Sequence, residues 1–264
     1  MGKSIMITSF KGGVGKSTVA VNLCVGLAVK KYKILIIDLD ASSGSVDLFM
    51  GCESGVIYNF FDVLEQRADI EKAVYSKKDY YQADILKSPP SYSLKDLPDL
   101  SIKIAEFIKE ASKIYDFIIF DCPSGKFEMF DHIAKCSDLI FVVTLHSSVS
   151  VRSAEKLASY LSEQDIKSGN VRLIINGFNA KGIAKGLNLG IVDIIESSKI
   201  KLIGLIEYSE TIRDYQELGK TCYEIKNKNP KLFFEDIIGR ILDENIILKR
   251  KYKGIKRTDL YFKR

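Results

Sequence analysis

The fold of this chain is decided by the stretch Ser9–Thr18, which reads SFKGGVGKST. It follows the apolar run Ile5–Ile7, which predicts a strand, and precedes Val19–Leu23, which predicts a helix. A glycine-rich turn between a strand and a helix start is the context of a phosphate-binding loop, because its backbone N–H groups can surround an anion. A lysine in such a loop neutralises the β- and γ-phosphates and the next hydroxyl ligates Mg²⁺. These are the roles we predict for Lys16 and Ser17.

The loop departs from the strict P-loop spacing at one position. Gly12, Gly13 and Gly15 let the backbone close around a phosphate without a Cβ in the way. The strict pattern also has a glycine at position 10, where this chain has Phe10, followed by Lys11. We therefore predict a phosphate site with an unusual entrance to the loop.

The rest of the chain predicts an α/β fold. Largely apolar runs at 34–37, 117–120, 139–144, 171–176 and 201–207 are typical of buried strands and alternate with longer helical patterns. A short run at 83–86 could add a strand, and residues 100–114 and 230–242 predict helices; the apolar side of the second is Leu232, Phe233, Ile237, Ile238 and Ile241. We expect one domain, residues 1–245, with a mostly parallel sheet and helices on both faces in three layers.

Carboxylates follow two of the predicted strands. Asp38 and Asp40 end the run at 34–37, and Asp121 ends the run at 117–120. Because ligands bind at the carboxyl ends of parallel strands, these groups should lie beside the P-loop. We predict that Asp38 and Asp121 hold Mg²⁺ through its waters and that Asp40 orients the attacking water. Gly125, in the sequence DCPSG after the second strand, could bring its amide to the γ-phosphate.

The composition indicates a reduced, cytosolic setting. Five cysteines are scattered without a paired metal spacing, and Cys122 is interpreted as a small buried thiol. No stretch approaches the roughly 18 apolar residues that span a bilayer, and the first strand begins too early to leave room for a signal peptide. His132 and His146 lie on no motif and are interpreted as ordinary surface or core histidines.

The basic charge is concentrated at the C-terminus. Residues 249–264 hold eight Lys or Arg and one Asp, a net charge of +7, so the remaining chain carries about −2 of the total +5. Apolar residues lie among these charges on one helical face. We predict that 246–264 is a basic amphipathic tail on an anionic membrane surface. A disordered, solvated tail and a nucleic-acid patch are the alternatives.

Two motifs carry a resemblance to a known family. KGGVGKST at 11–18 and DCPSG at 121–125 resemble the deviant Walker A motif and the switch of the MinD/ParA family of P-loop ATPases. The segment 38–51 is more similar to the MinD branch than to the ParA branch. The resemblance implies that Lys11 contacts the nucleotide of a partner subunit, that Asn176 bonds the adenine, and that Glu207 lies beside the base. The implied nucleotide-binding residues are Lys11, Gly12, Gly13, Val14, Gly15, Lys16, Ser17, Thr18, Gly125, Asn176 and Glu207, with Lys11, Lys16 and Asp40 as catalytic residues and Ser17, Asp38 and Asp121 at the metal.

The resemblance also implies a function. We expect hydrolysis of ATP to ADP with Mg²⁺, slow without an activator, in an ATP-dependent homodimer that helps to position the division septum. A MinC-like inhibitor and a peptide activator would be its partners. Its location would be cytoplasmic, at the inner face of the cell membrane. A ParA-like ATPase that binds DNA to position cargo is the first alternative, and a P-loop metabolic enzyme or reductase component is the second.

Overall fold

The computed structural model describes residues 2–40, 44–52, 57–76, 82–89, 99–226, 229–244 and 246. In these residues seven strands form one sheet in the order β3-β2-β4-β1-β5-β6-β7, and every neighbouring pair is parallel. The strands are β1 (Lys3–Ser9), β2 (Ile34–Asp38), β3 (Ala83–Lys87), β4 (Phe117–Ser124), β5 (Leu139–Thr144), β6 (Val171–Phe178) and β7 (Lys201–Glu207). The predicted parallel α/β fold is therefore confirmed.

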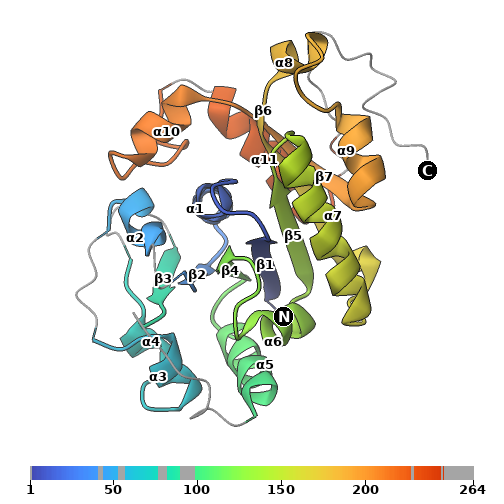
Figure 1. Ribbon diagram of the computed structural model, residues 1–264. Coiled ribbons are helices and arrows are strands. Elements are labelled where there is room, and N and C mark those ends of the chain that lie inside the picture. Colours follow the sequence, from blue (N-terminus) through green and yellow to red (C-terminus); the bar gives the residue numbers. More distant parts are fainter. Residues whose placement is uncertain are drawn as a thin grey trace.

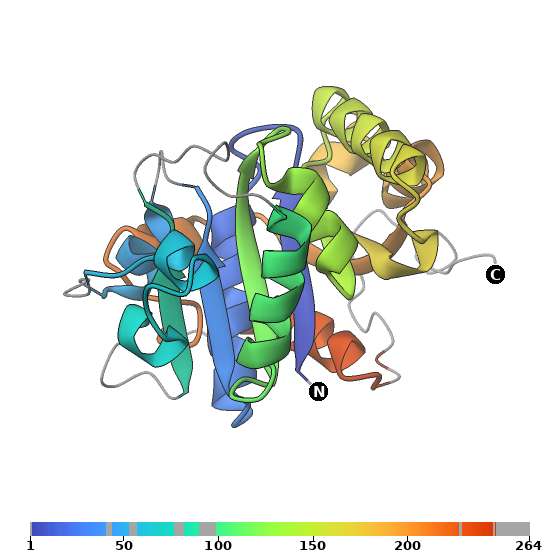
Figure 2. The same ribbon diagram turned by 90° about the horizontal axis from the view of Figure 1, so that it is seen from below.

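Helices cover both faces of this sheet (Figures 1 and 2). One face packs against α1 (Lys16–Val29), α2 (Ser45–Met50), α10 (Glu210–Gln216) and α11 (Asn229–Ile241). The other packs against α3 (Phe60–Leu64), α4 (Ile70–Ala73), α5 (Leu100–Ala111), α6 (Phe130–Cys136), α7 (Ser148–Glu163) and α9 (Ile191–Ser198), while α8 (Ala180–Ala184) follows β6.

The two hydrophobic cores follow from the alternation of side chains along the strands. Met6 and Phe120 point into one core, whereas their neighbours Ile5 and Ile119 point into the other, and all four are fully buried. Strands buried on both faces need no polar alternation, which explains the continuous apolar runs in the sequence. The three predicted layers are thus present.

Several local predictions can be compared with the structure. The run at 83–86 is the edge strand β3, as expected. The helix predicted to Ile114 ends at Ala111, because the chain then enters a turn. The final helix was assigned one wrong core residue: Leu232 is 37% exposed, whereas Phe234 is fully buried. The tail 246–264 lies outside the described residues except for Ile246, so the boundary at 245 stays a prediction.

The central strand β1 fixes where a ligand can bind. Strands β2, β3 and β4 lie on one side of it and β5, β6 and β7 on the other. The P-loop leaves the carboxyl end of β1, and the loops that leave its neighbours β4 and β5 therefore lie on opposite sides of it. Such a switch point leaves a crevice at this edge of a parallel sheet.

Candidate nucleotide site

The P-loop links β1 to α1 at the carboxyl edge of the sheet, as predicted. Gly13 and Gly15 have φ of +71° and +87°, a region that a side chain makes costly. Gly15 is also the N-cap of α1, and no side chain of the described residues caps this helix. The first N–H groups of α1 can therefore donate to a phosphate, in the positive field of the helix N-terminus.

Lys16 extends into the protein rather than into solvent. Its side chain is buried, and its Nζ donates to Ser124 Oγ at 2.8 Å. The next residue, Gly125, has a φ of +81°, and its amide donates to the carbonyl of Ser9 at 2.9 Å. Gly125, predicted to approach the γ-phosphate, is thus held against the end of β1 in this structure.

Two buried carboxylates lie side by side next to the loop. Asp38 in β2 and Asp121 in β4 are partners in the parallel register, and they are 2% and 0% exposed. Asp38 accepts hydrogen bonds from the amides of Val46 and Asp40, each at 3.1 Å. Among the described residues, both carboxylate oxygens of Asp121 are buried without a hydrogen-bond partner.

The burial of these groups sets their charge. Burial raises the pKa of Asp121 to about 8, and Asp38 adds to the rise, while the Ser17 hydroxyl and the Lys16 ammonium oppose it. Burial also raises the pKa of Asp38 to about 6, against the two backbone hydrogen bonds, with the carboxylates of Asp40 and Asp47 adding to the rise. The pair therefore resists full ionisation until a further positive charge lies beside it.

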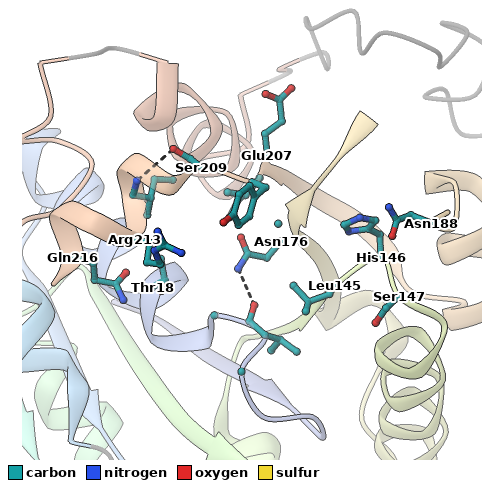
Figure 3. A pocket seen from close by; sticks show the side chains of 17 residues that line it. Thr18, Leu145, His146, Ser147, Asn176, Asn188, Glu207, Ser209, Arg213 and Gln216 are labelled. Atoms are coloured by element: carbon teal, nitrogen blue, oxygen red, sulfur yellow. Dashed lines mark hydrogen bonds between the residues drawn. The ribbon is translucent and has the colours of Figure 1, made fainter. Parts of the chain in front are cut away.

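A cavity of about 440 Å³ opens next to the loop (Figure 3). Its walls come from the P-loop, the segments after β5, β6 and β7, and α10. Asn176 of β6 lines it and donates from Nδ2 to the carbonyl of Val14 at 2.8 Å. A Cβ at Gly15 would collide with this amide, so a larger residue there would displace the Asn176 side chain. Glu207 and Thr18 also line the cavity, which joins the predicted base residues to the phosphate loop.

Comparison with known proteins identifies the family. Residues 2–174 match a family model described as an AAA domain. Septum site-determining protein MinD of Bacillus subtilis is 27% identical over 259 residues, 97% of this chain and 96% of that protein. MinD of Buchnera aphidicola subsp. Schizaphis graminum is 30% identical over 253 residues, 93% of both chains. One chain of the MinC:MinD cell division protein complex of Aquifex aeolicus matches this structure with a TM-score of 0.83 and 28% sequence identity. The match covers 94% of this chain and 98% of that one.

The chain belongs to the MinD/ParA family of P-loop ATPases. Within that family it is a MinD-like ATPase, so the predicted resemblance and the predicted class of enzyme are confirmed. The roles given above to single residues are not tested by this membership and stay predictions.

The cavity is also lined by side chains that were not identified from the sequence. His146, Asn188, Arg213 and Gln216 all line it. The interpretation of His146 as an ordinary histidine missed this position: its backbone carbonyl accepts from Leu189 N at 3.2 Å, and burial lowers its pKa. These residues belong to no local motif. The one signal for them is that each lies near the carboxyl end of a parallel strand or in the element that follows.

The structure also shows what surrounds four other residues named from the sequence: Cys122, Lys11, Gly12 and His132. Cys122 is buried, and burial raises the pKa of its thiol well above the ordinary value, as expected for a packing residue rather than a nucleophile. Lys11 is half-buried and Gly12 is exposed, on the outer part of the loop. His132 lies away from the pocket, with its Nδ1 2.6 Å from Ser101 Oγ.

Proposed function

We propose that this MinD-like ATPase is an ATP-dependent switch that helps to position the division septum from the membrane surface. The observation that carries the proposal is its similarity to septum site-determining proteins over more than nine-tenths of its length. In this proposal ATP binding makes a dimer, and hydrolysis by water returns the protein to the monomer. A MinC-like inhibitor and a peptide activator are the partners, the first supported by the MinC:MinD complex among similar structures.

The buried carboxylates support Mg²⁺ as the metal. Asp38, Asp121 and the Ser17 hydroxyl offer only oxygen atoms, the ligands that Mg²⁺ prefers, and it usually keeps several waters besides. A divalent cation near Asp121 would also stabilise two oxygens that otherwise lack a hydrogen bond. Bound there, Mg²⁺ would supply charge neutralisation to the phosphates. Lys16 and the loop amides would bind those phosphates, and Asp40 would orient the water.

The surface around the site supports a face-to-face dimer. Large apolar side chains are exposed after the carboxyl ends of several strands: Leu48 (64%), Val149 (69%), Leu187 (75%), Tyr208 (59%) and Leu218 (68%). Tyr208 lines the cavity, and the other four lie in segments that follow β2, β5, β6 and β7, at the edge of the sheet that carries the site. In such a dimer Lys11, on the outer part of the loop, would contact the partner's nucleotide.

The C-terminal sequence supports membrane binding through the tail. No helix in the described part of the chain could cross a membrane. Each basic residue near an anionic leaflet contributes about 1 kcal/mol, less in salt. One tail of eight basic residues with a short apolar face would bind weakly. Two tails on one dimer would bind much more tightly, because the second is held at high effective concentration. The nucleotide would thereby control where the protein is.

Sedimentation with anionic liposomes tests this proposal. We expect the full chain to pellet in ATP and not in ADP, and a chain truncated after Asn245 to remain in the supernatant while still binding ATP. Lys11→Ala is the matched control, because it keeps the tail and should lose the ATP-dependent pelleting together with the dimer. If the full chain does not pellet but binds DNA in ATP, with an affinity that falls steeply with salt, the ParA-like alternative replaces this proposal.

A further inference from the structure

The hydrogen bond from Gly125 N to Ser9 O is flanked by two side chains that meet on α7. Phe10 follows Ser9, and its ring lies 5.9 Å from the ring of Tyr160. Lys126 follows Gly125, and its Nζ lies 4.6 Å from the centroid of the same ring. In each of the two segments joined by this bond, the next residue along the chain thus contacts the same tyrosine.

The tyrosine itself is held firmly. Its hydroxyl donates to Asp131 Oδ1 at 2.5 Å, and Asp131 Oδ2 lies 3.2 Å from Lys126 Nζ. The ring of Phe130 is 5.9 Å from both Tyr160 and Phe10. We name these residues (Phe10, Lys126, Phe130, Asp131 and Tyr160) the Tyr160 cluster. It joins the P-loop, the segment after β4, α6 and α7.

We propose that Tyr160 is a positioning residue for the nucleotide site, which holds Gly125 away from the γ-phosphate. This inference rests on the proposed binding of ATP at the P-loop. For Gly125 to donate to the γ-phosphate its amide must leave Ser9 O. The Tyr160 cluster stabilises the arrangement in which this bond is made. Phe10 is the residue that departs from the strict P-loop pattern, so its ring gives this chain a contact that a glycine lacks.

The physical consequence is a difference between two nucleotides. A ligand that binds only a minor arrangement loses affinity in proportion to the population of that arrangement. ATP would require the released arrangement, whereas ADP has no γ-phosphate and gains nothing from it. Weakening the Tyr160 cluster should therefore tighten binding of ATP without changing binding of ADP.

Affinities for a non-hydrolysable ATP analogue and for ADP, measured by fluorescence titration of the full chain, test this inference. Lys126→Met removes the charge from an exposed side chain, and Tyr160→Leu removes the ring. We expect each to bind the analogue roughly threefold more tightly, the size of one exposed cation–π contact, with ADP unchanged. Tyr160→Phe keeps the ring and loses only the hydroxyl bond to Asp131, so its effect should be smaller than that of Tyr160→Leu. Lys109→Met, which removes the charge of another exposed lysine, on α5, is the matched control and should change neither affinity.

Each other result has a defined meaning. Equal changes in affinity for the analogue and for ADP would overturn the positioning role, because general loosening of the fold affects both ligands. No change in either variant would overturn it too. Tyr160→Leu could fold poorly, and Lys126→Met, at the surface, then decides the question alone. If the wild type binds neither nucleotide, it is the proposed ATP site that fails.

Discussion

The two ends of the nucleotide site are built in different ways. The phosphate end consists of one continuous loop and of two carboxylates that lie side by side in adjacent strands. The base end is a cavity assembled from segments that lie far apart in the chain, from Gly13 to Gln216. At the phosphate end, no neighbouring group can take over the role of a backbone amide or a buried charge. At the base end, several side chains line the cavity and share the contacts with the base. We therefore expect substitutions at the phosphate end to cost far more.

Lys16→Ala should give the largest effect. Lys16 is the buried cation of the loop, and its removal leaves the proposed phosphate charge without its partner. We expect ATP turnover to fall by about 100-fold or more, as for other preorganised charges at a reacting group. Steady-state release of phosphate measures this. Lys30→Ala, at the other end of α1 in a surface ion pair with Glu244, should be neutral. Retained turnover in Lys16→Ala would mean that hydrolysis occurs elsewhere.

Asp121→Asn should separate activity from stability. We expect turnover to fall by roughly 100-fold with the loss of a metal-side carboxylate. The protein without ligands should become more stable by about 1–3 kcal/mol near pH 8, because the wild type must then hold a buried carboxylate ionised whereas the asparagine is neutral.

The stability gain should depend on pH. The pKa of Asp121 is raised to about 8 in the fold, so between about pH 4 and 8 the folded protein binds more protons than the unfolded chain. Wild-type stability therefore falls as pH rises through this range, and the advantage of Asp121→Asn grows. Thermal unfolding at pH 5 and pH 8 without Mg²⁺ or nucleotide measures it. Asp69→Asn, an exposed carboxylate paired with Lys72, is the control. A variant that is less stable than the wild type at pH 8 would contradict this account.

The same contrast explains what could be predicted from the sequence. The P-loop is a local motif, and Asp38 and Asp121 were found because each ends an apolar run at the same edge of the sheet. The bond from Gly125 to Ser9 could not be predicted, because it follows a register shift between β1 and β4. The contacts of Tyr160 could not be predicted either, because they depend on how α7 packs against the P-loop and α6. His146 and Arg213 were missed because nothing in the local sequence says which loops meet.

Asn176→Ala should have the smallest effect of the three, and it tests whether the two ends are separate. Its amide donates to Val14 O, so this residue connects the base end to the loop. We expect ATP to bind about tenfold more weakly, the effect of one or two lost hydrogen bonds. Inorganic triphosphate, which has no base, distinguishes the two causes. If Asn176 serves the base, triphosphate binding is unchanged; if it mainly holds the loop, both affinities fall. Asn176→Asp keeps an acceptor but cannot donate to Val14 O, so it should resemble Asn176→Ala only in the second case. A loss as large as that of Lys16→Ala would mean that the base end is no more tolerant than the phosphate end.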